Sequence, residues 1–260
     1  MTDNATLGEL LAHGDASALA IRTPGREALT YDGLRALGVT MLGVLNASGI
    51  GRNDRIAIVL PNGPEMAAAF VSLAACATAA PLNPAYKAEE FEFYLSDLSA
   101  KAVIVLDGDE SPVIEAAEKL QIPLIPLTPQ PNGPAGAFSL APIAATPTAN
   151  GGMAGPDDTA LILHTSGTTS RPKIVPLSHS NVCASARNIS GWLNLQTEDC
   201  CLNVMPLFHI HGLIAAVLSS LCAGAGVACT PGFNALKFFS WINEIKPSWY
   251  TAVPTMHQTI

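Results

Sequence analysis

The chain has 260 residues, of which 49% are hydrophobic and 13% are charged, so it can bury a substantial core in one or two domains. Its formal net charge is −8 and it has no basic block, which disfavours nucleic acid as a partner. A membrane span needs roughly 20 apolar residues, and the longest uncharged apolar run, 213–229, is shorter and contains two glycines, so no membrane span is expected.

The amino terminus and the cysteines indicate a cytoplasmic protein. Asp3 stands near the start and no apolar segment follows it, so no secretory signal is visible. No two cysteines form a C-x-x-C pair, and most have apolar or small neighbours, which predicts buried thiols in a reducing compartment. The six cysteines are Cys76, Cys183, Cys200, Cys201, Cys222 and Cys229.

Short apolar runs alternate with helical patterns in the first half of the chain. The predicted strands are residues 18–22, 28–31, 55–60, 79–82, 102–106 and 123–127, and the predicted helices are 31–47, 65–78, 88–98 and 111–120. Two prolines in the last of these strands place it at a sheet edge. This alternation predicts an α/β fold of β-α units with mostly parallel sheets.

The alternation stops between residues 128 and 157, which are rich in Pro, Gly, Ala and Thr and carry almost no charge. Such a composition predicts a long connection, either a linker between domains or a loop within one. The chain therefore divides roughly into a first α/β portion, 1–127, the connection, 128–157, and a second α/β portion, 158–260.

The second portion repeats the alternation. Its predicted strands are residues 161–163, 174–177, 201–204, 226–230 and 249–252, and its predicted helices are 180–193, 213–222 and 235–245. A further helix begins at Pro254, close to the last residue of the chain.

The stretch from Leu161 to Lys173 carries the chemistry. Its apolar run ends abruptly and small or hydroxyl-bearing residues follow, which supply backbone N–H groups, hydroxyls and one ammonium in a small space. These groups suit a polyphosphate. A Walker-type loop needs glycine directly before the lysine, and Pro172 stands there instead. The plain alternative is a surface turn rich in Ser and Thr.

Three stretches together carry a resemblance to a known family. They are His-Thr-Ser-Gly-Thr-Thr-Ser-Arg-Pro-Lys at 164–173, Met-Pro-Leu-Phe-His-Ile-His-Gly at 205–212, and Trp-Tyr-Thr-Ala-Val-Pro-Thr at 249–255. In this order they resemble the adenylate-forming superfamily of acyl-CoA synthetases, luciferases and nonribosomal adenylation domains. They are most similar to its oxalate–CoA ligase branch, and the resemblance covers essentially the whole chain.

The resemblance implies an acid–CoA ligase and its substrates. A small carboxylic acid such as oxalate would be adenylated by ATP with Mg²⁺ and then transferred to CoA. The fold implied is part of a large N-terminal α/β domain, in which residues 128–157 would be a loop between strands. The alternatives are another adenylate-forming enzyme, for fatty or aromatic acids or in nonribosomal synthesis, and a non-catalytic nucleotide-binding α/β module.

The resemblance also assigns roles to residues. Its catalytic gate position matches His209, and His211 would bind the second carboxylate of a small diacid; two structural histidines are the plain alternative. If this segment is extended, the two side chains point to opposite sides. The ATP phosphates would be held by Thr165, Ser166, Gly167, Thr168, Thr169 and Lys173, and Val253, Pro254 and His257 would line the acid pocket. Phe208, Trp249 and Tyr250 are expected to be packing residues.

Two features depart from the family pattern. Ile174 follows the lysine where the family commonly has glycine, and a β-branched residue would be strained there if the backbone needed a positive φ. The family's Mg²⁺-binding glutamate, ribose-binding segment, hinge and C-terminal lid domain would all lie beyond Ile260. We therefore expect residues 1–260 to be an incomplete N-terminal domain that holds no metal ligand and is inactive alone.

Overall fold

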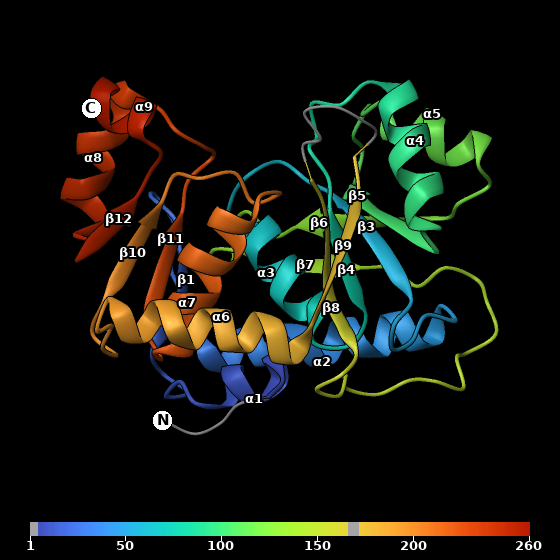
Figure 1. Cartoon of the computed structure of the whole chain (residues 1–260), viewed down its shortest axis with the longest axis horizontal. Coiled ribbons are helices and arrows are strands. Elements are labelled where there is room, and N and C mark those ends of the chain that lie inside the picture. Colours follow the sequence, from blue (N-terminus) through green and yellow to red (C-terminus); the bar gives the residue numbers. More distant parts are fainter. Residues whose placement is uncertain (1–4, 166–171) are drawn as a thin grey trace.

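A computed structural model describes residues 5–165 and 172–260, and its strands form two sheets that stand side by side (Figure 1). The seven-stranded sheet has the order β7-β6-β5-β3-β4-β8-β9, and the five-stranded sheet has the order β12-β10-β11-β1-β2. The antiparallel pairs of the described residues involve the edge strands β2, β7 and β9, and the other pairs are parallel. The predicted α/β class with mostly parallel sheets is confirmed.

Each sheet takes strands from both sides of the 128–157 connection. The seven-stranded sheet contains β3 (Arg55–Val59), β4 (Thr78–Pro81), β5 (Ala102–Leu106), β6 (Leu124–Pro129), β7 (Phe138–Leu140), β8 (Thr159–His164) and β9 (Ile174–Ser178). The five-stranded sheet contains β1 (Leu19–Arg22), β2 (Leu29–Thr30), β10 (Cys200–Asn203), β11 (Gly226–Cys229) and β12 (Trp249–Thr251).

Helices lie between the sheets and around them. They are α1 (Leu7–Ala12), α2 (Tyr31–Ala47), α3 (Pro64–Ala74), α4 (Ala88–Leu98), α5 (Val113–Lys119), α6 (His179–Trp192), a π-helix η1 (His211–Leu218), α7 (Ser219–Cys222), α8 (Ala235–Ile245) and α9 (Pro254–Thr259). In the part of the chain that the structure describes, none of them combines the length and the apolarity that a membrane crossing requires.

Helix α3 lies between the two sheets and contacts β1 and β11 on one side and β4 on the other (Figure 1). Almost all of its side chains are buried, from Met66 to Ala74. A helix that is apolar on all sides is stable only where other elements cover every face. The small side chains of Ala67, Ala68 and Ala69 allow this close approach, and Phe70 fills the space beside them.

Strand β3 shows why strands of the seven-stranded sheet have continuous apolar sequences. Ile56 and Ile58 join the core cluster that contains α3, whereas Ala57 and Val59 join a second cluster with α4 and α5. Successive side chains of a strand point to opposite faces, so helices on both faces bury Ile56, Ala57, Ile58 and Val59.

Strand β6 corrects one prediction. Its prolines were expected to place it at an edge, but β7 pairs with it from Leu127 to Pro129 and forms the edge itself. The carbonyls of Pro123 and Leu127 accept hydrogen bonds from β5, so the backbone of Pro126 faces outward. Because the β7 ladder begins only at Leu127, no ladder hydrogen bond is lost at Pro126.

The long connection is anchored beside the end of α2. The N–H of Thr148 donates to the carbonyl of Asn46 at 3.0 Å, and the N–H of Arg52 donates to the carbonyl of Asn150 at 2.9 Å. The connection also contributes β7, which the sequence analysis missed together with α1.

The cysteines agree with the prediction of buried thiols, except that Cys222 is half-buried. All six are free, and burial raises the pKa of Cys76 and of Cys229 to about 12. Thiols of this kind are poor nucleophiles near neutral pH.

His179 connects the amino-terminal helix to the core. Its ring is fully buried, Nδ1 accepts a hydrogen bond from the N–H of Leu7 at 3.2 Å, and Nε2 has no partner among the described residues. Burial lowers the pKa of His179 from 6.5 to about 4, although the nearby charge of Asp158 acts in the opposite direction. The folded protein therefore holds this imidazole neutral.

We predict that this histidine makes stability depend on pH. The unfolded chain protonates His179 first as the pH falls, so its contribution is complete above about pH 6.5 and is lost toward pH 4. A shift of this size corresponds to roughly 3 kcal/mol. Urea unfolding of the wild type and of His179→Gln, which keeps an acceptor for Leu7, should give free energies whose difference changes by that order across the window. An unchanged difference would contradict the prediction.

Candidate active site

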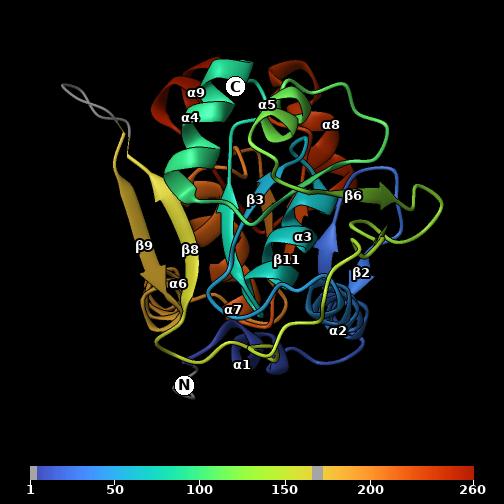
Figure 2. The ribbon, with the colours of Figure 1, turned by 90° about the vertical axis from the view of Figure 1, so that its right-hand side faces the viewer.

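The predicted phosphate loop connects β8 to β9, whose hairpin stands at one margin of the molecule (Figure 2). The N–H of Thr165 donates to the carbonyl of Lys173 at 3.0 Å, and the N–H of Lys173 donates to Oγ1 of Thr165 at 3.3 Å. These bonds fix both ends of the loop, and the Lys173 side chain is exposed to solvent. The other predicted phosphate ligands, Ser166, Gly167, Thr168 and Thr169, lie outside the described residues.

Ile174 does not carry the strain that the sequence suggested. It begins β9, pairs with His164 across the hairpin, and is not among the residues with positive φ. Its side chain packs against the hydrophobic cluster beneath α4. A β-branched residue suits an extended strand with a partly buried face, so the conditional expectation of strain at this position is not met.

A cavity of about 460 Å³ opens beside the end of β8. Its walls come from the loop after β4, from α4, from the ends of β8 and β9, and from the turn after β10. Strands β4 and β8 of the described residues share one register pair, Ala79 with Leu161. A crevice at the carboxyl ends of parallel strands is the usual binding position in α/β folds.

This cavity brings two predicted site residues together. Thr165 ends the hairpin of the seven-stranded sheet, and His209 lies in the turn that follows β10 of the five-stranded sheet. The His209 side chain is exposed, and its ring packs against Phe208 with centroids 4.7 Å apart. Phe208 itself lines the cavity. The geometry therefore places a titratable imidazole beside the start of the predicted phosphate loop.

The His-x-His segment is a turn and a helix start, so the condition of an extended segment, from which opposite directions of the two side chains were expected, is not met. The N–H of His209 donates to the carbonyl of Pro206 at 3.4 Å, and His211 opens the π-helix. The turn packs so tightly on this helix that a Cβ at Gly212 would come within 2.4 Å of the Pro206 carbonyl oxygen. The two rings still point apart, because the turn directs His209 to the cavity and His211 elsewhere.

His211 contacts β12 instead of the cavity. Its Nε2 lies 2.5 Å from Oγ1 of Thr251, and burial lowers its pKa, which favours the neutral ring. The expectation that Trp249 and Tyr250 are packing residues agrees with their positions against hydrophobic clusters. In the described part of the chain, His211 thus connects the π-helix to the five-stranded sheet.

The remaining predicted acid-pocket residues lie around α9. Val253 caps this helix, Pro254 is its first residue, and Nδ1 of the exposed His257 lies 3.1 Å from the hydroxyl of Tyr250. Neither these three residues nor His211 lines the cavity formed by the described residues. Their roles toward a substrate stay predictions.

His164 is one of the lining residues to which the sequence motifs assigned no role. Its Nε2 lies 3.0 Å from Oδ2 of Asp97, and its side chain is 7% exposed. The ring of Tyr94 meets it edge to face at 4.7 Å, and Tyr86 stacks on Tyr94 at 4.8 Å. Burial raises the pKa of Tyr86, with a hydrogen bond to Tyr94 as a further cause.

One sequence signal could have indicated this cluster. Tyr94 and Asp97 are three residues apart on a predicted helix, so they share a face. Strand alternation after the apolar run also turns His164 away from Leu163. What the sequence does not show is that this helix face lies against the end of β8.

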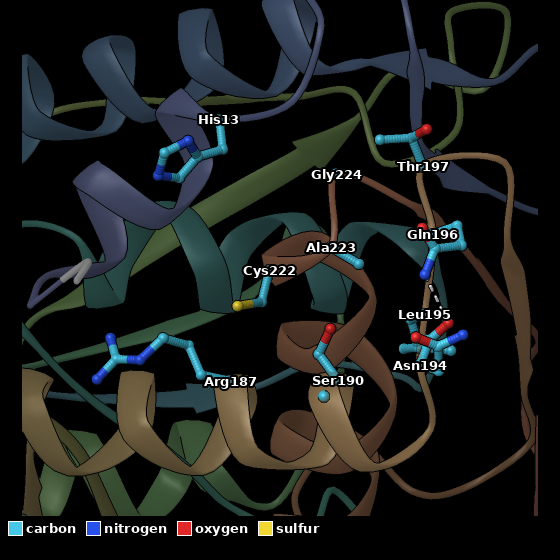
Figure 3. A pocket seen from close by; sticks show the side chains of 11 residues that line it. His13, Arg187, Ser190, Asn194, Leu195, Gln196, Thr197, Cys222, Ala223 and Gly224 are labelled. Atoms are coloured by element: carbon cyan, nitrogen blue, oxygen red, sulfur yellow. Dashed lines mark hydrogen bonds between the residues drawn. The ribbon is translucent and has the colours of Figure 1, made fainter. Parts of the chain in front are cut away.

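A second cavity, of about 400 Å³, is lined by residues of α6 and α7 and by His13, which follows α1. Figure 3 shows Arg187 and Ser190 of α6 beside Cys222 of α7. Burial raises the pKa of the Cys222 thiol, although Arg187 opposes this. Residues predicted from the family motifs are not part of its lining.

Comparison with known proteins places these observations in a family. Residues 10–260 match the family described as AMP-binding enzyme. A probable CoA ligase, CCL9 of Humulus lupulus, is 40% identical over 277 residues, which cover 100% of this chain and 51% of the relative. The oxalate–CoA ligase of Arabidopsis thaliana is 40% identical over 271 residues, which cover 99% of this chain and 52% of the relative.

A solved structure gives the same result for the fold. The ATP-bound crystal structure of MatB from Rhodopseudomonas palustris superposes with a TM-score of 0.80 at 26% identity, over 98% of this chain and 50% of that one. The chain thus spans about half the length of the curated relatives it matches.

We predict that Ile174→Gly destabilises the protein. The substitution removes a side chain that packs beneath α4 and frees the backbone of β9, which together cost about 2 kcal/mol. Urea unfolding measures the loss. Ile174→Val is the matched control, because it keeps β-branching and should cost less than about 1 kcal/mol. A glycine variant as stable as the wild type would show that Ile174 is strained after all.

Proposed function

Because the chain belongs to the AMP-binding enzyme family, we propose that it forms the phosphate-binding part of an acid–CoA ligase. In this proposal residues 1–260 belong to the N-terminal domain, and a C-terminal lid domain completes the enzyme. The observation that carries the proposal is the cavity at the strand ends, where Thr165 of one sheet and His209 of the other face the same space. The relatives, named as CoA ligases, support it.

The first half-reaction is adenylation of the acid. A carboxylate oxygen attacks the α-phosphorus of ATP, and the bond to the leaving pyrophosphate breaks. The protein must hold the β- and γ-phosphates and neutralise their charge, which is the proposed task of Lys173 and the loop from Thr165 to Thr169. The hydrogen bonds between Thr165 and Lys173 bring the two ends of that loop together.

The second half-reaction is transfer of the acyl group to CoA. His209 occupies the proposed gate position, and its place in an exposed turn next to a π-helix would let it move with little disturbance of the core. His211, Val253, Pro254 and His257 remain our proposed contacts to the acid, approached from the β12 and α9 side.

Oxalate, or a similar small dicarboxylate, is the proposed acid. The support is the similarity of the motif residues to the oxalate–CoA ligase branch and the 40% identity with the Arabidopsis relative of that name. The Mg²⁺ implied by the resemblance finds no ligand set here, because residues 5–165 and 172–260 contain no group of three or more His, Cys, Asp or Glu placed to hold a metal ion.

We predict that Lys173→Ala weakens binding of a fluorescent ATP analogue by about 10- to 100-fold, since charge-assisted contacts to phosphate contribute roughly 1.5–3 kcal/mol. Titration of the 260-residue chain measures this. Lys237→Ala, which removes an exposed lysine on α8, is the matched control and should bind the analogue as the wild type does. Equal affinities of the Lys173 variant and the wild type for the analogue would show that this lysine does not bind the phosphates.

Substrate profiling tests the proposed activity. The chain alone should release no pyrophosphate, whereas the chain joined to the C-terminal half of the Arabidopsis relative should release it with oxalate in preference to malonate, acetate or a fatty acid. Preference for a fatty acid would assign a different acid class. Binding of ATP without turnover in the joined protein would favour a non-catalytic nucleotide-binding module.

A further inference from the structure

The Asp97–His164 pair has the geometry of a histidine base with an orienting carboxylate. Nε2 of His164 lies 3.0 Å from Oδ2 of Asp97, and the Tyr94 ring holds the imidazole edge to face at 4.7 Å. The histidine side chain is 7% exposed, whereas that of Asp97 is 38% exposed. A base held by a third group within hydrogen-bond distance is the arrangement found in activated nucleophile systems.

The contact with Asp97 determines which nitrogen of the His164 ring carries the proton and which one is free to accept another. A carboxylate only accepts hydrogen bonds, so Nε2 must carry the proton that it donates to Asp97. In the neutral ring, Nδ1 then holds the free electron pair and can accept a proton. The carboxylate also stabilises the imidazolium that this transfer creates.

The cavity that His164 lines suits a flexible alkyl thiol. Leu163, Val175 and Leu177, which lie on the face of the hairpin opposite to the His164 ring, give it apolar walls together with Ile210, and Tyr86 and Tyr94 line it on the side of that ring. Thr165 and His209 give it polar edges next to the proposed phosphate loop. His209 contacts Phe208 but has no carboxylate partner among the described residues, so it lacks the orienting group that His164 has.

We propose that His164, positioned by Asp97, is the general base for the thiol of CoA in the second half-reaction; this rests on the proposed ligase function. Nδ1 takes the proton of the thiol, and the resulting thiolate attacks the carbonyl carbon of the acyl adenylate. The carbon–sulfur bond forms, the bond from that carbon to the phosphate oxygen breaks, and AMP leaves with the electron pair. The imidazolium then releases its proton to solvent along the exposed side of Asp97.

In residues 5–165 and 172–260, few other titratable groups surround His164. Asp97 and Tyr94 reach it from α4, Tyr86 stands behind Tyr94 in the loop after β4, and His209 lies in the turn that lines the same cavity. Burial raises the pKa of Tyr86, so its phenol stays neutral near neutral pH. Among the residues that the structure describes, Asp97 is thus the carboxyl group in contact with the ring.

The test measures the two half-reactions separately in the joined protein described above. Pyrophosphate release reports adenylation, and thioester formation from synthetic oxalyl adenylate and CoA reports the second step. His164→Gln should leave adenylation within about twofold of the wild type and lower thioester formation about 100-fold at neutral pH. Added imidazole, or a pH at which the thiol ionises by itself, should restore the rate.

Asp97→Asn should lower thioester formation about 10- to 100-fold and change its pH profile, because the histidine loses its orienting charge. Glu92→Gln is the matched control: it removes a carboxylate from the same helix, where Glu92 pairs with the exposed Lys119 at 2.7 Å. Thermal unfolding of each variant checks that the hairpin remains folded.

Three results would overturn the proposal. They are an unchanged thioester rate in His164→Gln, an equal loss in both half-reactions, and a loss that imidazole and alkaline pH leave in place. If the joined wild-type protein does not adenylate any acid, the proposed function fails instead.

In that case the 260-residue chain by itself can still be used to test whether His164 acts as a base. With pantetheine as probe, the wild-type chain should speed alkylation of the thiol by iodoacetamide about tenfold at neutral pH and His164→Gln should not, with the pantetheine product followed by mass spectrometry. The absence of this difference would remove His164 as a base.

Discussion

The arrangement of the whole molecule depends on the burial of α3. Its side chains from Met66 to Ala74 are buried, so the helix has no face that water could cover. Apolar surface contributes about 25 cal/mol per Å² when it leaves water, and here that surface is shared between two sheets. The approach of other segments is close as well, since a Cβ at Gly136 would come within 2.8 Å of the Pro64 carbonyl oxygen. The sheets therefore hold one position relative to each other.

The site inherits its geometry from this constraint. Asn62 lies just before α3, and its side chain accepts a hydrogen bond from the N–H of Leu207 at 2.7 Å and donates one to the carbonyl of Thr230 at 2.9 Å. The turn that carries His209 is thereby fastened to the loop in front of the central helix. Because the phosphate hairpin belongs to the other sheet, the packing of α3 also sets the space between that hairpin and the turn.

Local patterns predicted most elements, and tertiary contacts decided the rest. The helix Ala88–Leu98 and the strand Ala102–Leu106 have the bounds that their periodicity and flanking residues predict. The apolar run after His211 is hydrophobic on all sides. It has no alternation of polar and apolar residues from which a helical period could be read, so its π-helical geometry could not be predicted. The pattern of a strand also does not predict which other strand it pairs with. Ile21 of β1, for example, pairs with Val227 of β11, which is more than 200 residues away in the sequence. The proposed role of His164 depends on Asp97, which is 67 residues away in the sequence.

At the end of β8, strand alternation directs two neighbouring side chains to different tasks. Leu163 faces the side of Val175 and joins the main core, whereas His164 faces α4 and its carboxylate. Thr165 then contributes its backbone and hydroxyl to the loop. A one-residue shift in the register of this strand would exchange the two side chains, burying the imidazole without its partner and exposing the leucine. The packing that stabilises the hairpin therefore also aims His164 at Asp97, so the core and the proposed chemistry depend on the same register.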